Sequence, residues 1–198
     1  MKPNLLIDTL PDTVEVDGSV FPIRSDFRIG ILFELMISDR ELSDKEKLGQ
    51  MLTLYFVNEI PENLEEAIEQ ILDFYACGKK RRKKDSSKEK RKGISSPVYS
   101  FEHDDGMIFA AFFDQYGIDL NDIEHLHWWK FKAMFDALKE DNEIVKIMSY
   151  RATDLSTIKD KHERSRIARL KAIHAIPNNM SFDEKVSAAG AIFGGGLK

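Results

Sequence analysis

Apolar residues recur along the chain with two different periods. Two short β-branched runs within residues 13–23 flank Asp17-Gly18, a pair that tolerates the positive φ angles of a tight hairpin turn. From residue 27 onward, the apolar residues recur every three to four positions, which is the spacing of an α-helix. The sequence therefore predicts a mostly α fold, a helical domain with a small N-terminal β-hairpin.

Three helices are expected in the first half of the chain. The first runs roughly from Phe27 to Ile37, and the second follows a capping box formed by Ser43 and Glu46 and covers KLGQMLTLYFVN. The third, ENLEEAIEQILDFYACG, carries one apolar stripe along its length. We expect Pro61 in the first turn of this third helix, and Gly78 as its end.

The pattern in the second half of the sequence predicts four further helices and a weaker one near the C-terminus. In the fourth of them, Ile158, Ile167, Leu170 and Ile173 are expected to face inward, and Pro177 follows its last residue. The predicted ranges are about 104–116, 121–141, 142–151 and 155–176, and the capping box Ser181–Glu184 opens the weaker helix.

A run of charges divides the two halves. The sequence KKRRKKDSSKEKRK, from Lys79 to Lys92, holds ten basic and two acidic residues and nothing apolar, so we expect a flexible, solvated linker. Residues 1–78 are predicted to form the hairpin and the first helices, and residues 79–97 the linker. A helical part at 98–177 is expected to pack with the first part as one domain. A weakly ordered tail follows at 178–198.

The basic linker also raises a question of binding. Its candidate contact residues are Lys79, Lys80, Arg81, Arg82, Lys83, Lys84, Arg91 and Lys92. A stretch of this kind can release counterions from nucleic acid, yet it has no interleaved aromatic residues for base stacking. A solubilising linker is the favoured interpretation, and docking on an acidic protein or contact with nucleic acid are the alternatives.

Composition narrows the class of protein. With 198 residues, 42% of them hydrophobic, the chain can bury a real core, and the net charge of −5 disfavours nucleic acid as a partner of the whole chain. No apolar run has the roughly 18 to 20 residues of a membrane span. The single cysteine and the absence of an export signal indicate a soluble protein of the reducing cytoplasm.

The two tryptophans are adjacent, in LHWWKF at residues 126–131. On a helix, neighbouring side chains point about 100° apart, so Trp128 belongs to the main apolar stripe. Trp129 shares a second apolar face with Leu126 and Ala133, beside Lys130. Either this helix packs on both sides, or Trp129 is exposed and anchors a partner or a second subunit. The residues predicted to contact such a partner are Trp129, Leu126 and Lys130, with Phe109, Phe112 and Tyr116 of the preceding apolar helix if that helix is not wholly enclosed.

No pattern of residues predicts an active site. His125 and His127 diverge if they lie on a helix, and Asp104 and Asp105 are explained as caps of the helix that follows them. No nucleophile elbow, zinc-protease motif or phosphate-binding glycine loop is found. The sequence therefore predicts no catalytic residue, no metal and no cofactor.

Four segments resemble one family of phage proteins. FYACGK at 74–79, YSFEHDDGMIFAAFFDQYGIDL at 99–120, LHWWKFKAMFDAL at 126–138 and MSYRATDLSTIKDK at 148–161 are similar to the gene-product-fifteen family of long-tailed phages and prophages of Gram-positive bacteria. The resemblance runs from about residue 5 to residue 177, and the tail after it departs from the family pattern.

The resemblance implies a place in tail morphogenesis. Members are encoded near the tail-tube and tape-measure genes, where other long-tailed phages carry tail assembly chaperones. By that analogy the protein would be a non-enzymatic tail assembly chaperone in the host cytoplasm, absent from or minor in the virion. Its partner would be the tape-measure protein, with the tail-tube protein and a homo-oligomer as further candidates. The alternative is a structural tail protein, or one that contacts nucleic acid through the basic loop.

Overall fold

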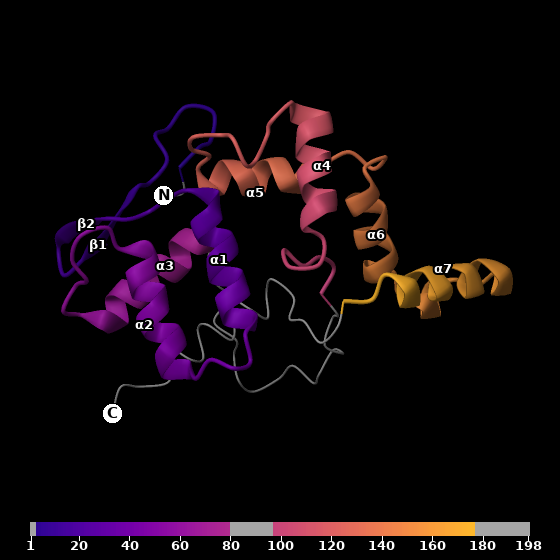
Figure 1. Ribbon diagram of the computed structural model, residues 1–198, viewed down its shortest axis with the longest axis horizontal. Coiled ribbons are helices and arrows are strands. Elements are labelled where there is room, and N and C mark those ends of the chain that lie inside the picture. The colour runs from indigo at the N-terminus through magenta and orange to yellow at the C-terminus, as the bar shows by residue number, and fades with distance from the viewer. Residues whose placement is uncertain (1–2, 80–96, 177–198) are drawn as a thin grey trace. The chain divides into compact units, whose positions relative to one another are not determined.

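The computed structural model describes residues 3–79 and 97–176, and these residues form two compact units (Figure 1). Unit 1 consists of residues 3–79 and 124–134, and unit 2 of residues 97–123 and 135–176. The fold is mostly α, as predicted, with a two-stranded antiparallel sheet near the N-terminus. That the two halves pack as one domain stays a prediction.

The predicted hairpin opens unit 1. Strands β1 (Thr13–Val16) and β2 (Ser19–Pro22) pair antiparallel, and Asp17 and Gly18 form the turn with φ angles of 49° and 73°. Both φ angles are positive, as a two-residue turn of this kind requires. The backbone N–H of Asp17 donates to Glu66 Oε2 at 2.9 Å, which holds the turn against the third helix.

Two helices follow the hairpin. Helix α1 (Phe27–Ser38) is capped by Asp26, and helix α2 (Asp44–Tyr55) begins with the predicted capping box of Ser43 and Glu46. The two helices contact each other. Both predictions are therefore confirmed, although α2 ends three residues earlier than the expected range.

Helix α3 (Leu64–Tyr75) carries the predicted apolar stripe but begins later than expected. Asn63 caps it by accepting from the backbone N–H of Glu66, so Pro61 lies before the helix and not in its first turn. At the other end, Gly78 has a φ of 63° and its N–H donates to the carbonyl of Asp73, which closes the helix as predicted.

The predicted long helix at 121–141 is wrong at both ends, since helix α5 spans only Trp128–Asp136. Before it, the chain runs as an extended segment that pairs with residues 25–27: the N–H of Phe27 donates to the carbonyl of Leu126, and the N–H of Trp128 to that of Ser25. After it, the side chain of Gln115 accepts from the N–H of Lys139 at 2.8 Å. These contacts with distant residues replace helical hydrogen bonds, which sequence periodicity does not reveal.

Unit 2 is built on two helices predicted almost to the residue. Helix α4 (Asp105–Tyr116) ends at Gly117, whose φ is 64°, and helix α6 (Glu143–Ala152) contacts α4. The buried residues of α6, Ile144, Ile147 and Arg151, recur at helical spacing. A single face of α6 therefore enters the interior of unit 2.

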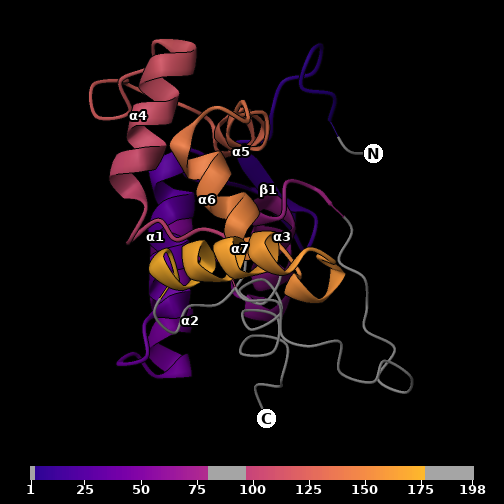
Figure 2. The ribbon, with the colours of Figure 1, turned by 90° about the vertical axis from the view of Figure 1, so that its right-hand side faces the viewer.

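The predicted helix at 155–176 is in fact two elements. Asp154 caps a short 3₁₀ helix, η1 (Leu155–Thr157), and Asp160 caps helix α7 (Lys161–Ile173) by accepting from the N–H of Glu163. Of the four residues expected to face inward, only Ile167 is buried, and Ile173 is 61% exposed. In both views of the ribbon α7 runs across the direction of α6 (Figure 2), and Ile167 is the residue of α7 that is buried.

The core of unit 1 is largely aromatic. Trp128 is fully buried, with its ring stacked on Tyr75 at 5.5 Å and on Phe131 at 5.8 Å between centroids. Gly30 brings the backbone of α1 against the same ring, and a Cβ atom there would lie 2.3 Å from it. Only glycine fits this approach.

The predictions for residues 80–96 and 177–198 lie outside the described residues. They are most of the basic linker, the helix expected after Ser181 and the C-terminal tail.

Candidate functional site

Both tryptophans cap the C-terminal end of α3. The indole N–H of Trp128 donates to the carbonyl of Tyr75 at 2.8 Å, and the indole N–H of Trp129 donates to the carbonyl of Phe74 at 2.7 Å. The last four carbonyls of a helix have no partner within the helix. The adjacent tryptophans supply donors to two of them.

This capping explains why the tryptophans are neighbours in sequence. Consecutive side chains on α5 diverge, and so do consecutive carbonyls at the end of α3, which lets two adjacent rings reach two adjacent carbonyls. Trp129 is 4% exposed and Leu126 is 7% exposed, so the prediction that Trp129 projects into solvent is wrong. The alternative of a helix packed on both sides is the one observed here. Of this group of candidates, only Lys130 is exposed.

His127 supports the same arrangement from the start of α5. Its Nδ1 accepts from the N–H of Trp129 at 3.1 Å, and its Nε2 lies 3.0 Å from the carbonyl of Pro11. The neutral ring with the proton on Nε2 satisfies both contacts. Burial lowers the pKa of His127 below its usual value, while the Pro11 carbonyl acts in the opposite direction.

Helix α4 carries the three other candidate contact residues, and they differ in exposure. Phe112 is fully buried, whereas Phe109 and Tyr116 are half-buried. Desolvation raises the pKa of the Tyr116 hydroxyl. The helix is therefore not wholly enclosed. Phe112 is no longer a candidate for contact with a partner, because it is buried.

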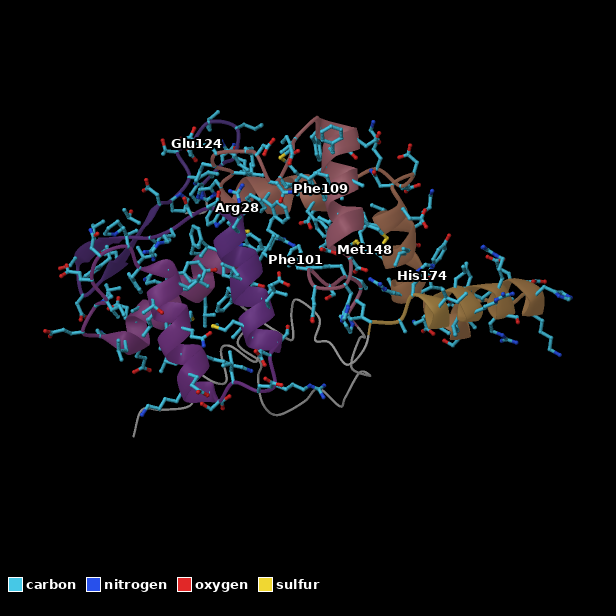
Figure 3. All side chains as sticks on the ribbon, viewed as in Figure 1. Arg28, Phe101, Phe109, Glu124, Met148 and His174 are labelled. Atoms are coloured by element: carbon cyan, nitrogen blue, oxygen red, sulfur yellow. The ribbon has the colours of Figure 1, made fainter. Side chains whose placement is uncertain are left out.

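Phe113 was missed as a candidate and is the most exposed aromatic residue of this helix. It is 55% exposed, and its ring stacks on Phe109 with centroids 6.3 Å apart and planes 12° apart (Phe109 is labelled in Figure 3). The four-residue spacing places both rings on one side of α4. The four-residue spacing is present in the sequence. However, α4 is apolar at so many positions that periodicity does not show which side of the helix faces solvent.

A second exposed apolar surface lies in unit 1, on a turn at residues 4–8. The backbone N–H of Asn4 donates to Asp8 Oδ2 at 2.7 Å, and the N–H of Leu6 donates to Asn4 Oδ1 at 3.0 Å. Leu6 is 90% exposed and Ile7 is 81% exposed on this turn. Hydrogen bonds to the Asn4 and Asp8 side chains thus stabilise a turn that exposes two large aliphatic side chains to solvent.

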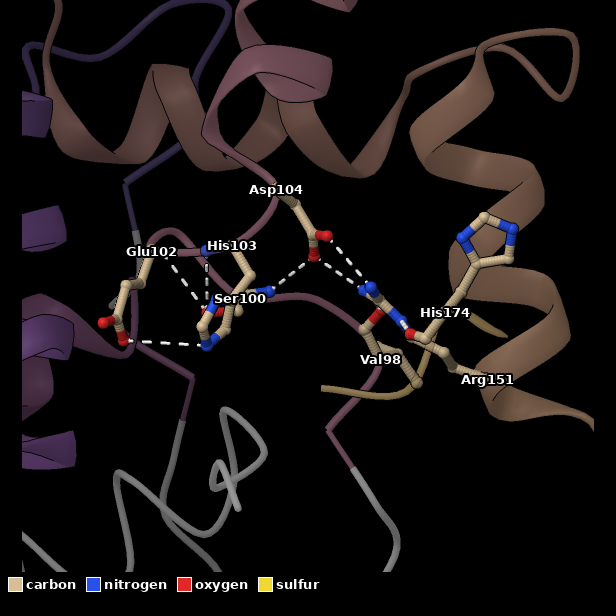
Figure 4. Close-up of polar contacts among 7 residues, drawn as sticks. All are labelled: Val98, Ser100, Glu102, His103, Asp104, Arg151 and His174. Atoms are coloured by element: carbon tan, nitrogen blue, oxygen red, sulfur yellow. Dashed lines mark hydrogen bonds and ion pairs between the residues drawn. The ribbon is translucent and has the colours of Figure 1, made fainter. Parts of the chain in front are cut away.

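Unit 2 contains a buried ion pair between Asp104 and Arg151. Arg151 donates to the two carboxylate oxygens of Asp104 at 2.6 and 2.9 Å, and to the carbonyls of Val98 at 3.0 Å and His174 at 2.6 Å (Figure 4). Asp104 also accepts from the N–H of Ser100 at 2.8 Å. Arg151 therefore joins the entry to α4 and the end of α7 to the face of α6.

The prediction that the Asp104 side chain caps α4 is wrong. Asp104 occupies the capping position but makes no side-chain hydrogen bond to the helix, because its carboxylate is engaged by Arg151 and Ser100. Arg151 was not recognised from the sequence. Arg151 follows Ile144 and Ile147 at helical spacing and so lies on the buried stripe of α6. That position is the signal that could have indicated a buried charge.

The histidines considered as metal ligands make other contacts. His125 and His127 do not lie on a helix as predicted, and His125 Nε2 lies 3.5 Å from the Ser25 hydroxyl. Across residues 3–79 and 97–176, no three His, Cys, Asp or Glu side chains are grouped so that they could hold a metal ion.

Of the basic loop, only Lys79 lies within the described residues, and it is exposed. Lys80, Arg81, Arg82, Lys83, Lys84, Arg91 and Lys92 lie outside them. None of the helices described is both long enough and apolar enough to cross a bilayer.

The contacts above define a class of protein: mostly helical, with buried polar groups that join segments far apart in the sequence. Its exposed large apolar side chains include those on α4 and at residues 4–8. A family model described as Bacteriophage Gp15 protein matches residues 6–176. The chain belongs to this family of bacteriophage proteins, as the resemblance of its segments predicts. No curated protein and no solved structure matches the chain.

Proposed function

We propose that this phage protein is a tail assembly factor, a non-enzymatic chaperone that binds apolar helical segments of the tape-measure protein in the host cytoplasm. The observation that supports this function is the exposed aromatic stack of Phe109 and Phe113 on α4. An apolar helix in water needs a partner surface of this kind, because burying its stripe removes apolar area from solvent.

The two stacked rings can pack against the apolar stripe of a helix. Phe109 and Phe113 are one turn apart, the same spacing as the anchors of an amphipathic helix. Phe113 is more than half exposed, so a partner that covers it gains most of the ring's apolar area. Large aromatic side chains are frequent among the residues that dominate binding energy.

The test is co-expression of the tagged protein with segments of the tape-measure protein from the same phage genome, followed by a pull-down and light scattering of the eluate. The unchanged protein should give a soluble complex of fixed stoichiometry. Phe113→Ser should lower the recovered segment at least tenfold, as expected when an aromatic anchor worth more than about 1.4 kcal/mol is lost.

Two further variants make the result specific. Ile173→Ser removes another exposed apolar side chain from a helix of unit 2 and should leave the complex intact. Leu6→Ser with Ile7→Ser removes the apolar turn of unit 1 and tests it as the contact surface instead. If every segment is soluble alone and none co-purifies, the chaperone proposal is wrong.

A further inference from the structure

We propose that the outer face of α7 binds duplex DNA through its phosphate backbone, a site separate from α4 and from the basic loop. Between Lys159 and Lys171 the chain has six basic residues and two acidic ones, although its overall net charge is −5. This local excess of positive charge lies on a helix of which only one side is covered.

The positive charges on α7 are largely without partners. Arg166 pairs with Glu163 at 2.7 Å, and the ammonium of Lys171 donates to the carbonyl of Thr153 at 2.9 Å. Lys161, Arg164 and Arg169 are exposed and form no ion pair with any residue that the structure describes. In a chain with more acids than bases, three exposed cations on one helix that have no ion-pair partner within residues 3–79 and 97–176 are available to an external anion.

Their arrangement around the helix is specific. Ile167 marks the buried side of α7. At about 100° per residue, Ser165 and Arg169 lie about 20° to either side of the direction opposite Ile167, and Ala172 and Lys161 lie about 40° and 60° from it on the side of Ser165. Ser165 and Ala172 therefore lie between Arg169 and Lys161, and Arg164 lies beyond Lys161, about 60° from Ile167. Nitrogen-tipped side chains project on more than one side of α7 in Figure 3.

A helix with this cross-section fits the major groove of B-DNA. The groove is about 12 Å wide, and a helix with its side chains is about 10 to 12 Å across. Small residues at the front of the helix allow it to enter, and cations on both flanks meet the phosphates of both strands. Arginine suits this contact, because its planar guanidinium donates two hydrogen bonds to one phosphate.

The same face is poorly suited to an acidic protein. A protein interface has an apolar centre, whereas the outer face of α7 offers small and charged residues, with Ile173 as its one large exposed apolar side chain. Interfaces with DNA are more polar and more positively charged. Ser165 and Arg169 are the side chains directed most nearly away from Ile167, and only one of them is long enough to reach far into a groove, so the binding should show little preference for base sequence.

The experiment is fluorescence anisotropy of the full chain with a labelled 20-base-pair duplex of mixed sequence, over a range of salt concentrations. The double variant Arg164→Gln with Arg169→Gln should bind at least tenfold more weakly at low salt. Its plot of log affinity against log salt should be shallower by roughly 2, because each phosphate contact contributes about 0.9 to the slope.

A matched control removes two positive charges elsewhere. Lys45→Gln with Lys139→Gln changes two exposed lysines outside α7 and should retain the affinity and slope of the unchanged protein. A third variant, with the basic residues from Lys79 to Lys92 replaced by serine, should keep a component of binding that depends on Arg164 and Arg169. Circular dichroism of each variant confirms that the helices are intact.

Three results would overturn the proposal. The α7 variant could match the unchanged protein in affinity and slope, or the serine variant could abolish all binding. Polyglutamate could also displace the duplex at equal charge concentration, which would assign the face to an acidic protein. None of these results bears on the complex with tape-measure segments, because that proposal depends on α4.

Discussion

The two units stabilise their interiors by different means. In unit 1 the contact that holds the end of α3 is neutral: two indole N–H groups donate to its carbonyls, and aromatic rings surround them. In unit 2 the central polar contact is a charged pair, Asp104 with Arg151, and both side chains are buried. The contact that joins distant segments at the end of α3 is therefore neutral, whereas the one that joins them at the entry to α4 is charged.

The difference lies in what each contact loses when one partner is removed. A neutral hydrogen bond leaves an unpaired carbonyl, whereas a broken buried ion pair leaves an unpaired charge. Unit 2 should thus be the more sensitive to single substitutions at its polar contact. Unit 1 should be the more sensitive to changes in ring volume, since its rings pack face to face.

The largest effect is expected at Asp104. Asp104→Ala leaves the Arg151 guanidinium buried without its carboxylate and should lower the free energy of unfolding by about 3 to 5 kcal/mol. Urea denaturation followed by circular dichroism measures the loss. The double variant Asp104→Leu with Arg151→Met should be less destabilised than Asp104→Ala, and a larger loss would show that the pair stabilises unit 2 outright.

The next effect concerns the caps of α3. Trp128→Phe and Trp129→Phe each keep an aromatic ring and remove one N–H from a buried carbonyl, for an expected loss of about 1 to 3 kcal/mol each. Because both donors serve the same helix end, the double variant should lose less than the sum of the single losses. Strict additivity in urea titrations would mean that the two caps act independently.

A smaller effect is expected from pH at His127. Because burial lowers the pKa of His127 in the folded protein, the folded state favours the neutral ring, and its stabilising effect is present above the unfolded pKa of about 6.5. As pH falls through 6.5 toward the folded value, this stability is lost, by at most about 1.4 kcal/mol per pH unit.

The matched variant for this pH dependence is His127→Gln, whose amide can accept from one neighbour and donate to another but does not titrate in this range. Thermal unfolding at pH 7.5 and 5.5 should show a smaller acid-induced decrease for the variant. Equal decreases would place the acid sensitivity elsewhere.

The smallest effect is expected at Phe113. Its ring is 55% exposed, so Phe113→Ser should change the free energy of unfolding by no more than about 0.5 kcal/mol. Chemical denaturation provides the measurement. A loss of several kcal/mol would mean that the ring is part of the core of unit 2, and its use as a binding surface would then be excluded.

The sequence predicted those parts of the fold that depend on local signals. The hairpin follows from Asp17-Gly18, α2 from the capping box of Ser43 and Glu46, and the end of α4 from Gly117. Each of these signals acts within four residues of the element that it controls. Periodicity and turn chemistry therefore suffice for them.

The errors occur where distant segments decide the local structure. The helix expected from residue 121 is replaced by an extended segment because Leu126 and Trp128 pair with residues 25–27, about a hundred positions away. The carboxylate of Asp104 leaves its helix for Arg151, which is 47 positions away. Helical spacing predicted α4 itself, but not which of its aromatic side chains are exposed: Phe113 is exposed and Phe112 is buried, which packing decides.

The shared position of the two tryptophans also makes them a spectroscopic reporter. Both indoles lie in unit 1, buried and bound to the same end of α3, so intrinsic tryptophan emission follows the environment of that unit alone. Far-ultraviolet circular dichroism, in contrast, records the helices of both units. If the two signals change at the same denaturant concentration, the chain unfolds as one cooperative domain, and if they change separately, each unit melts by itself.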